Sequence, residues 1–110
     1  MEAVDLPRLL SGHDFSEEAY LEFLRVPSLS VGLYVLPAGA RDPQQPHTED
    51  EVYHVVSGKG QIRVGVEDRA VRAGTVVFVE AGVDHRFYDI EEDLEVLVFF
   101  APAEGSGRER

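Results

Sequence analysis

PQQPHTEDEVYHVVSG (residues 43–58) and AGTVVFVEAGVDHRF (residues 73–87) are the two most strongly patterned stretches of this 110-residue chain. Together they contain four candidate metal ligands, which are Gln45, His47, Glu51 and His85. Two histidines and one carboxylate with open coordination positions form the ligand set of many non-haem iron sites. The sequence therefore predicts a metal site, provided that the fold brings the two stretches together.

Strand periodicity decides which of these residues share a face. If residues 47–55 are extended, alternate side chains point the same way, and the face in question carries His47, Glu49, Glu51, Tyr53 and Val55. The opposite face carries Asp50, Val52, His54 and Val56. Polar groups concentrated on a buried face need a partner, and a metal ion would satisfy several at once. Glu49 shares this face, but its place near the start of the strand favours a solvated side chain.

Length and composition narrow the class of protein. A chain of 110 residues with 44% hydrophobic content predicts one globular domain. It has no cysteine, so disulfides, thiolate zinc sites and a cysteine nucleophile are excluded. A net charge of −11 opposes binding to nucleic acid. No apolar run approaches the roughly 20 residues of a membrane helix, and no signal-like segment is present. We therefore expect a cytoplasmic protein that binds neither nucleic acid nor membranes.

The local patterns predict one helix followed by strands. Residues 14–25 have apolar residues at helical spacing after a capping-box-like Asp14 and Glu17, and Pro27 ends the segment. Beyond it the patterns indicate about seven short strands at the spacing of a sandwich or small barrel. They are expected over residues 28–36, 51–56, 61–66, 69–72, 75–79, 85–90 and 94–101. Residues 57–60 are expected to form a tight hairpin and residues 91–93 a turn.

The two patterned stretches resemble the motifs of the cupin superfamily. In the first motif Gly39 precedes Gln45-Pro46-His47, three residues separate His47 from Glu51, and six separate Glu51 from Gly58. In the second motif Gly74 is followed by Glu80-Ala81-Gly82, then His85, then Asp89. The resemblance spans about residues 30–101, and both motifs occur in order.

The resemblance implies a fold and a metal site. The fold would be a small antiparallel cupin β-barrel or jelly roll with one N-terminal helix. Residues 1–27 would form the helical segment packed on the barrel, residues 28–102 the barrel, and residues 103–110 a flexible tail. His47, Glu51 and His85 would converge on a divalent metal ion, either Fe, Mn, Ni or Zn. Gln45 stands where the family has its first histidine and is a further candidate ligand through its amide oxygen.

The resemblance leaves two classes of function open. One is a metal-dependent enzyme, dioxygenase-like or isomerase-like, that acts on a small-molecule substrate not specified by the sequence. The other is a non-catalytic module that binds a small ligand with a degenerate or absent metal site. Cupins commonly pair through sheet edges, which also covers exposed edge strands, so a homodimer is expected.

Overall fold

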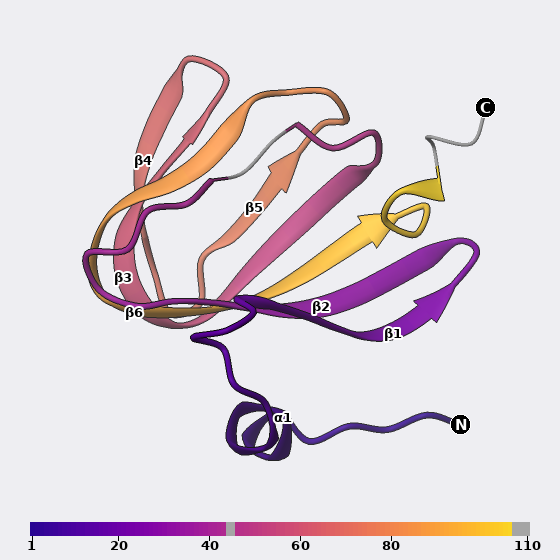
Figure 1. Cartoon of the computed structure of the whole chain (residues 1–110). Coiled ribbons are helices and arrows are strands. Elements are labelled where there is room, and N and C mark those ends of the chain that lie inside the picture. The colour runs from indigo at the N-terminus through magenta and orange to yellow at the C-terminus, as the bar shows by residue number, and fades with distance from the viewer. Residues whose placement is uncertain (44–45, 107–110) are drawn as a thin grey trace.

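A computed structural model describes residues 1–43 and 46–106 of the chain. Within these ranges the chain forms one short helix and six strands (Figure 1). The elements are α1 (Leu6–Gly12), β1 (Tyr20–Val26), β2 (Leu29–Leu36), β3 (Asp50–Val64), β4 (Glu67–Arg72), β5 (Val76–Val79) and β6 (His85–Ala101). Every strand pairing is antiparallel. The predicted all-β class with one N-terminal helix is therefore confirmed.

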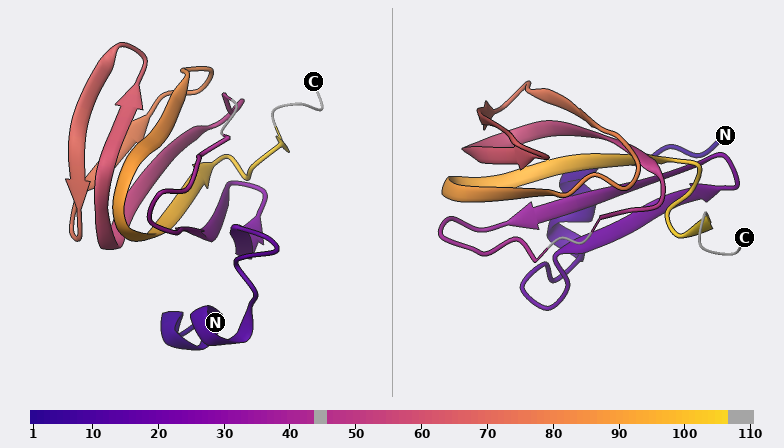
Figure 2. Two further views of the ribbon diagram at one scale, coloured as in Figure 1. Left: turned by 60° about the vertical axis from the view of Figure 1, so that its left-hand side comes forward. Right: turned by 90° about the horizontal axis from the view of Figure 1, so that it is seen from above.

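Two long strands form the centre of the sheet. β3 and β6 pair along almost their whole length, from Asp50 opposite Ala101 to Val64 opposite His85. The strand order is β1-β2-β6-β3-β4, and β5 pairs with the first part of β3. The sheet curls upon itself into a half-open barrel (Figure 2). Its concave face carries the apolar core, which includes Leu36, Tyr53, Val55, Ile62, Val71, Phe87, Leu94 and Val96.

Bulges at residues 55–61 allow β3 and β6 to bend together. The register of the pair shifts three times between Val55 and Gln61. Within this stretch Gly58 has a φ of +98°, and a Cβ at this position would lie 2.2 Å from the carbonyl oxygen of Asp93. Glycine is required there because only a residue without a side chain allows the two backbones to approach so closely.

This arrangement corrects two turn predictions. The glycine-rich residues 57–60 do not form a hairpin but lie inside the continuous strand β3. The acidic residues 91–93 do not form a turn but lie inside β6. In both places turn-type residues mark a bend within paired strands, because a bulge needs the same small or exposed residues as a turn. The chain instead reverses at Gly65, whose φ is +59°, between β3 and β4.

The predicted helix over residues 14–25 is wrong. Residues 20–26 form strand β1, which pairs with β2 from Tyr20 opposite Tyr34 to Val26 opposite Leu29. Asp14 does make a local turn, since the backbone N–H of Ser16 donates to its Oδ1 at 3.0 Å, but the turn does not propagate. The sheet edge offered by β2 overrides the helical spacing of the apolar residues.

The observed helix lies earlier in the chain. α1 begins with Pro7 in its first turn and buries none of its residues. Figures 1 and 2 show it set apart from the curled sheet. Among the described residues no helix has the length and apolar character needed to cross a lipid bilayer.

Candidate metal centre

His47, Glu51 and His85 come together inside the curled sheet. One ligand atom from each lies within 4.8 Å of those of the other two. Oε1 of Glu51 lies 2.9 Å from Nε2 of His85 and 3.9 Å from Nε2 of His47. The side chains of Glu51 and His85 are each 1% exposed, and that of His47 is 13% exposed. The fold therefore assembles the three residues into a group that could bind a metal ion.

Main-chain contacts between the two motif segments position this group. Glu51 lies on β3, where it pairs with Val79 of β5. The turn after β5 then returns to the first motif, since Gly82 donates its N–H to the carbonyl of His47 at 2.7 Å. Ala81 donates its N–H to Oδ1 of Asp50 at 2.8 Å. The turn therefore delivers His85, the first residue of β6, to the same end of the barrel as His47.

The hydrogen bonding of His85 fixes which nitrogen faces Glu51. Its Nδ1 lies 2.9 Å from the carbonyl oxygen of Val83, and a carbonyl can only accept, so Nδ1 carries the proton. Nε2 of the neutral ring then presents a lone pair toward the Glu51 carboxylate. Burial opposes protonation of the ring, but the Glu51 carboxylate and the Val83 carbonyl outweigh it and raise the pKa of His85 above 6.5.

The buried polar atoms of this group are incompletely satisfied. Among the described residues, both carboxylate oxygens of Glu51 and Nε2 of His85 are buried without a hydrogen bond of good geometry. Lone pairs that face one another in a buried site repel unless a cation or a proton lies between them. Two imidazole nitrogens and one carboxylate suit divalent Fe, Mn, Ni or Zn. The residues present therefore fit a bound divalent metal ion.

A pocket of about 290 Å³ adjoins the group on the side of His47. Its lining is mainly apolar and consists of Tyr20, Tyr34, Pro43, His47, Val98, Phe100 and Glu104. The ring of His47 packs against that of Phe100 at a centroid distance of 4.8 Å. Because His47 belongs to both the ligand group and the pocket wall, a small molecule in this pocket would lie next to the metal position.

Two polar side chains of the pocket wall come from outside the motifs. Tyr20 lies on β1, and its hydroxyl is buried with no hydrogen-bond partner among the described residues. Its ring lies over Gly32, where a Cβ would come within 2.1 Å of the ring. Glu104 follows β6, and its Oε2 lies 3.5 Å from Nδ1 of His47. Burial is the main cause that raises the pKa of both groups.

The sequence identified some of these residues and missed others. The predicted alternation on β3 is confirmed, since Glu51, Tyr53 and Val55 are all buried. Glu49 is not solvated as expected, because it is 2% exposed and its Oε1 accepts the N–H of Gly105 at 3.0 Å. It is not part of the metal-binding group. Gln45 lies outside the described residues, so its predicted role as a ligand stays a prediction.

The sequence patterns do not identify Tyr20 or Glu104 as pocket residues. They predict a helix at Tyr20 and a flexible tail at Glu104. The only signal for Tyr20 is the aromatic and apolar content of YLEFLRV, which also fits a strand. No local pattern marks Glu104, because its contact with His47 joins residues 57 positions apart.

Comparison with known proteins identifies the family of this barrel. The model of the cupin domain family matches residues 32–100, which include both motif segments and all three ligand-type residues. The chain therefore belongs to the cupin domain family, as the motif resemblance predicted.

Individual proteins are also similar to this chain. The chain is 52% identical over 104 residues to the uncharacterized protein SCO3923 of Streptomyces coelicolor, covering 94% of this chain and 99% of that protein. Its fold is similar to that of TT1209 from Thermus thermophilus, with a TM-score of 0.75, 26% identity and coverage of 94% and 99% of the two chains. It is also similar to the DMSP lyase DddQ from Ruegeria pomeroyi, with a TM-score of 0.65 and 25% identity. That match covers 69% of this chain and 39% of the lyase.

Proposed function

We propose that this chain is a metal-dependent enzyme that acts on a small molecule bound in the pocket beside His47. One observation carries the proposal. His47 belongs both to the group formed with Glu51 and His85 and to the wall of the pocket. A bound divalent ion would act as a Lewis acid on an oxygen of the substrate. The lining of the pocket suits a compact molecule that has an apolar part and a polar end.

The polar groups of the pocket favour proton-transfer chemistry, of the isomerase or lyase type, over a dioxygenase reaction. Tyr20 would donate a hydrogen bond from its hydroxyl to the bound molecule, since burial keeps this group protonated. The Glu104 carboxylate borders the same pocket as a hydrogen-bond acceptor. The similarity to a protein named as a lyase supports this preference. Phe100 and Val98 would exclude water from the reacting end of the molecule.

Metal analysis is the first experiment. Protein purified without chelators should contain close to one equivalent of a divalent metal, and the His47→Ala/His85→Ala double variant should contain almost none. Equal, near-zero metal in both proteins would refute the metal-dependent function. If metal is present, a panel of small molecules that have an apolar part and a polar end should be screened for turnover. Oxygen uptake should be measured in parallel, because consumption of dioxygen would indicate an oxygenase reaction instead of proton transfer.

A non-catalytic binding module is the second candidate. The short contact between Nε2 of His85 and Oε1 of Glu51 favours this candidate, since a proton on Nε2 would satisfy both side chains without a metal ion. In that case ligands would raise the melting temperature equally with and without a chelator. Stabilisation that disappears on chelation would favour the enzyme.

A further inference from the structure

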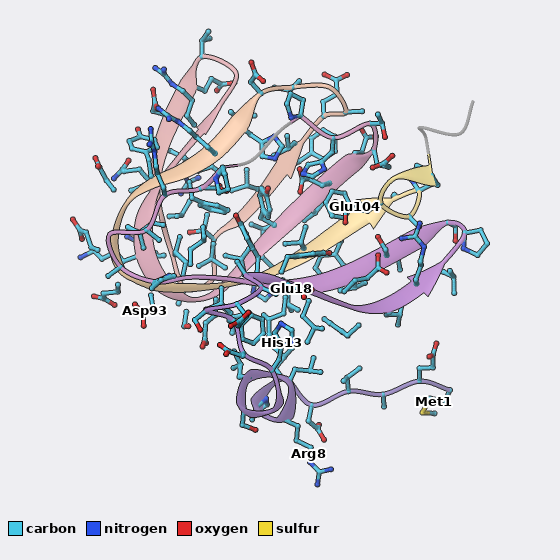
Figure 3. The ribbon with its side chains drawn as sticks, viewed as in Figure 1. Met1, Arg8, His13, Glu18, Asp93 and Glu104 are labelled. Carbon is cyan, nitrogen blue, oxygen red and sulfur yellow. The ribbon has the colours of Figure 1, made fainter. Side chains whose placement is uncertain are left out.

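We propose that Glu104 is the positioning residue of His47, holding its imidazole so that Nε2 points at Glu51 and His85. This inference rests on the metal-dependent function proposed above and adds a residue outside the region matched by the family, which ends at residue 100. Glu104 follows β6 and lies beside the end of that strand (Figure 3).

The geometry of the His47 ring supports this role. Nε2 of His47 lies 3.9 Å from Oε1 of Glu51, whereas Nδ1 lies 3.5 Å from Oε2 of Glu104. A neutral imidazole carries one proton, so a ring that offers its Nε2 lone pair to a metal must carry that proton on Nδ1. Nδ1–H then faces a carboxylate, which can only accept. At 3.5 Å the contact is longer than a strong hydrogen bond, and the side chain of Glu104 is 30% exposed.

The backbone of Glu104 is held by contacts that do not involve its carboxylate. Residues 102–106 form a segment, here called the C-terminal strap, that packs back over β1 and β2. The N–H of Glu104 donates to Oγ of Ser30 at 2.9 Å, and its carbonyl accepts from Arg25 at 2.8 Å. Next along the strap, the N–H of Gly105 donates to Glu49 at 3.0 Å. The side chain of Glu104 can therefore be changed without removing the bonds that anchor the strap.

A donor on His47 would satisfy the Glu104 carboxylate. The side chain of Glu104 is 30% exposed, and a partly buried carboxylate is costly unless a donor faces it. Carboxylates behind metal-binding histidines fix the ring orientation and increase its basicity, and removing them typically lowers metal affinity by about 10–100-fold.

Metal affinity in three variants tests the inference. Affinity for Zn²⁺ and Co²⁺ would be measured by competition with a chromogenic chelator. Glu104→Ala should bind about 10–100-fold more weakly than wild type, whereas Glu104→Gln should recover most of the loss because its amide oxygen still accepts from Nδ1–H. Glu91→Gln is the matched control, since it removes one exposed carboxylate paired with Lys59 and should bind like wild type. Equal affinity in Glu104→Ala and the control would overturn the inference, and so would a Gln variant as weak as the Ala variant.

A second measurement does not depend on metal. In metal-free protein labelled with ¹⁵N-histidine, at about pH 8 where imidazole is mainly neutral, His47 should be mostly in the Nδ1–H form. Glu104→Ala should shift His47 toward the Nε2–H form and leave His85, which Val83 holds, unchanged. An unchanged tautomer of His47 would refute positioning by Glu104. A wild-type protein without metal affinity would refute the proposed function instead, and the tautomer comparison would still decide the role of Glu104.

Discussion

Nε2 of His85 lies 2.9 Å from Oε1 of Glu51, and both side chains are almost fully buried. Nδ1 of the same ring is occupied by the carbonyl of Val83, so the lone pair of Nε2 and the carboxylate face each other. In the absence of a metal ion this contact requires a proton between the two atoms, and with that proton on Nε2 the two side chains form a buried ion pair. Such pairs contribute little net stability, because desolvation of the two charges offsets their attraction.

The first prediction concerns Glu51→Gln. The variant should lose its metal, because the carboxylate ligand is gone. Its melting temperature in the presence of EDTA should be close to that of wild type, because the His85 ring can become neutral and its Nε2 can then accept a hydrogen bond from the Gln amide. Circular dichroism melts and metal analysis measure the two effects. Glu49→Gln is the control and should retain its metal, and a drop of many degrees in Glu51→Gln would show that the ion pair holds the barrel together.

Tyr20→Phe tests the pocket wall. Because the hydroxyl of Tyr20 is buried without a partner among the described residues, its removal should leave the free energy of unfolding unchanged or raise it by up to about 1 kcal/mol. Urea unfolding of the ligand-free protein measures this change. Any small molecule found to bind in the pocket should bind Tyr20→Phe more weakly. A loss of more than about 1 kcal/mol in the ligand-free protein would mean that the hydroxyl already has a structural bond.

Gly58→Ala should destabilise the barrel through the β3–β6 bulge. The new Cβ would meet the Asp93 carbonyl at 2.2 Å and would also require a φ of +98°. We expect a loss of about 3 kcal/mol or more, since strain at positive φ alone costs about 1–3 kcal/mol. Gly74→Ala is the matched control, because Gly74 has a φ of +94° but open space around it. Similar losses in the two variants, measured by urea unfolding, would show that the close backbone approach is unimportant.

A pH-dependent effect is expected at the exposed end of the β3–β4 hairpin. The hydroxyl of Tyr88 donates to Asp68 at 2.7 Å, and this bond, together with Arg63, holds the pKa of Asp68 below 3.8. A depressed carboxyl pKa stabilises the fold above pH 3.8, and this stabilisation is lost as the pH falls through the folded-state pKa. NMR titration should show the pKa of Asp68 rising toward 3.8 in Tyr88→Phe. Glu67→Gln, next to Asp68, should leave that pKa unchanged.

β5 is the place where we expect the proposed homodimer to form. It pairs with β3 and with no second strand among the described residues. Val76 and Phe78 on this strand are 62% and 61% exposed. An apolar edge of this kind invites pairing with another chain. Light scattering should give about twice the 12.2 kDa chain mass, and Phe78→Lys should shift it toward the monomer. A wild-type monomer at all concentrations would contradict the prediction.

The ligand-type residues could be predicted in two ways. Alternation along β3 predicts that His47 and Glu51 share a face, whereas the convergence of His85 with them is implied by the resemblance of the two motifs to those of cupins. The long strands could not be predicted in the same way, because Gly58 looks like a turn residue in sequence and serves as a bulge residue in the fold. Asp89 shows the same ambiguity, since its φ of +46° is tolerated by aspartate within a strand as well as in a turn.

The helix prediction failed because local spacing favours the wrong element. Residues 20–26 have polar residues three positions apart, as in a helix, and pairing with the edge of β2 makes them a strand. Glu104 could not be predicted at all, because its position depends on hydrogen bonds that join the strap with Ser30 and Arg25. Contacts between residues so far apart in the sequence become visible only once the fold is known.

Tyr20 and Glu104, which supply polar groups to the pocket, both lie outside residues 32–100, the part of the chain matched by the family. His47, Glu51 and His85 all lie inside it. Changes at either end of the chain would therefore alter the pocket while leaving the three ligand-type residues themselves in place. A comparison restricted to the shared barrel would not detect such changes in the pocket. Substrate preference within this part of the family should be traced through the sequence that precedes and follows the barrel.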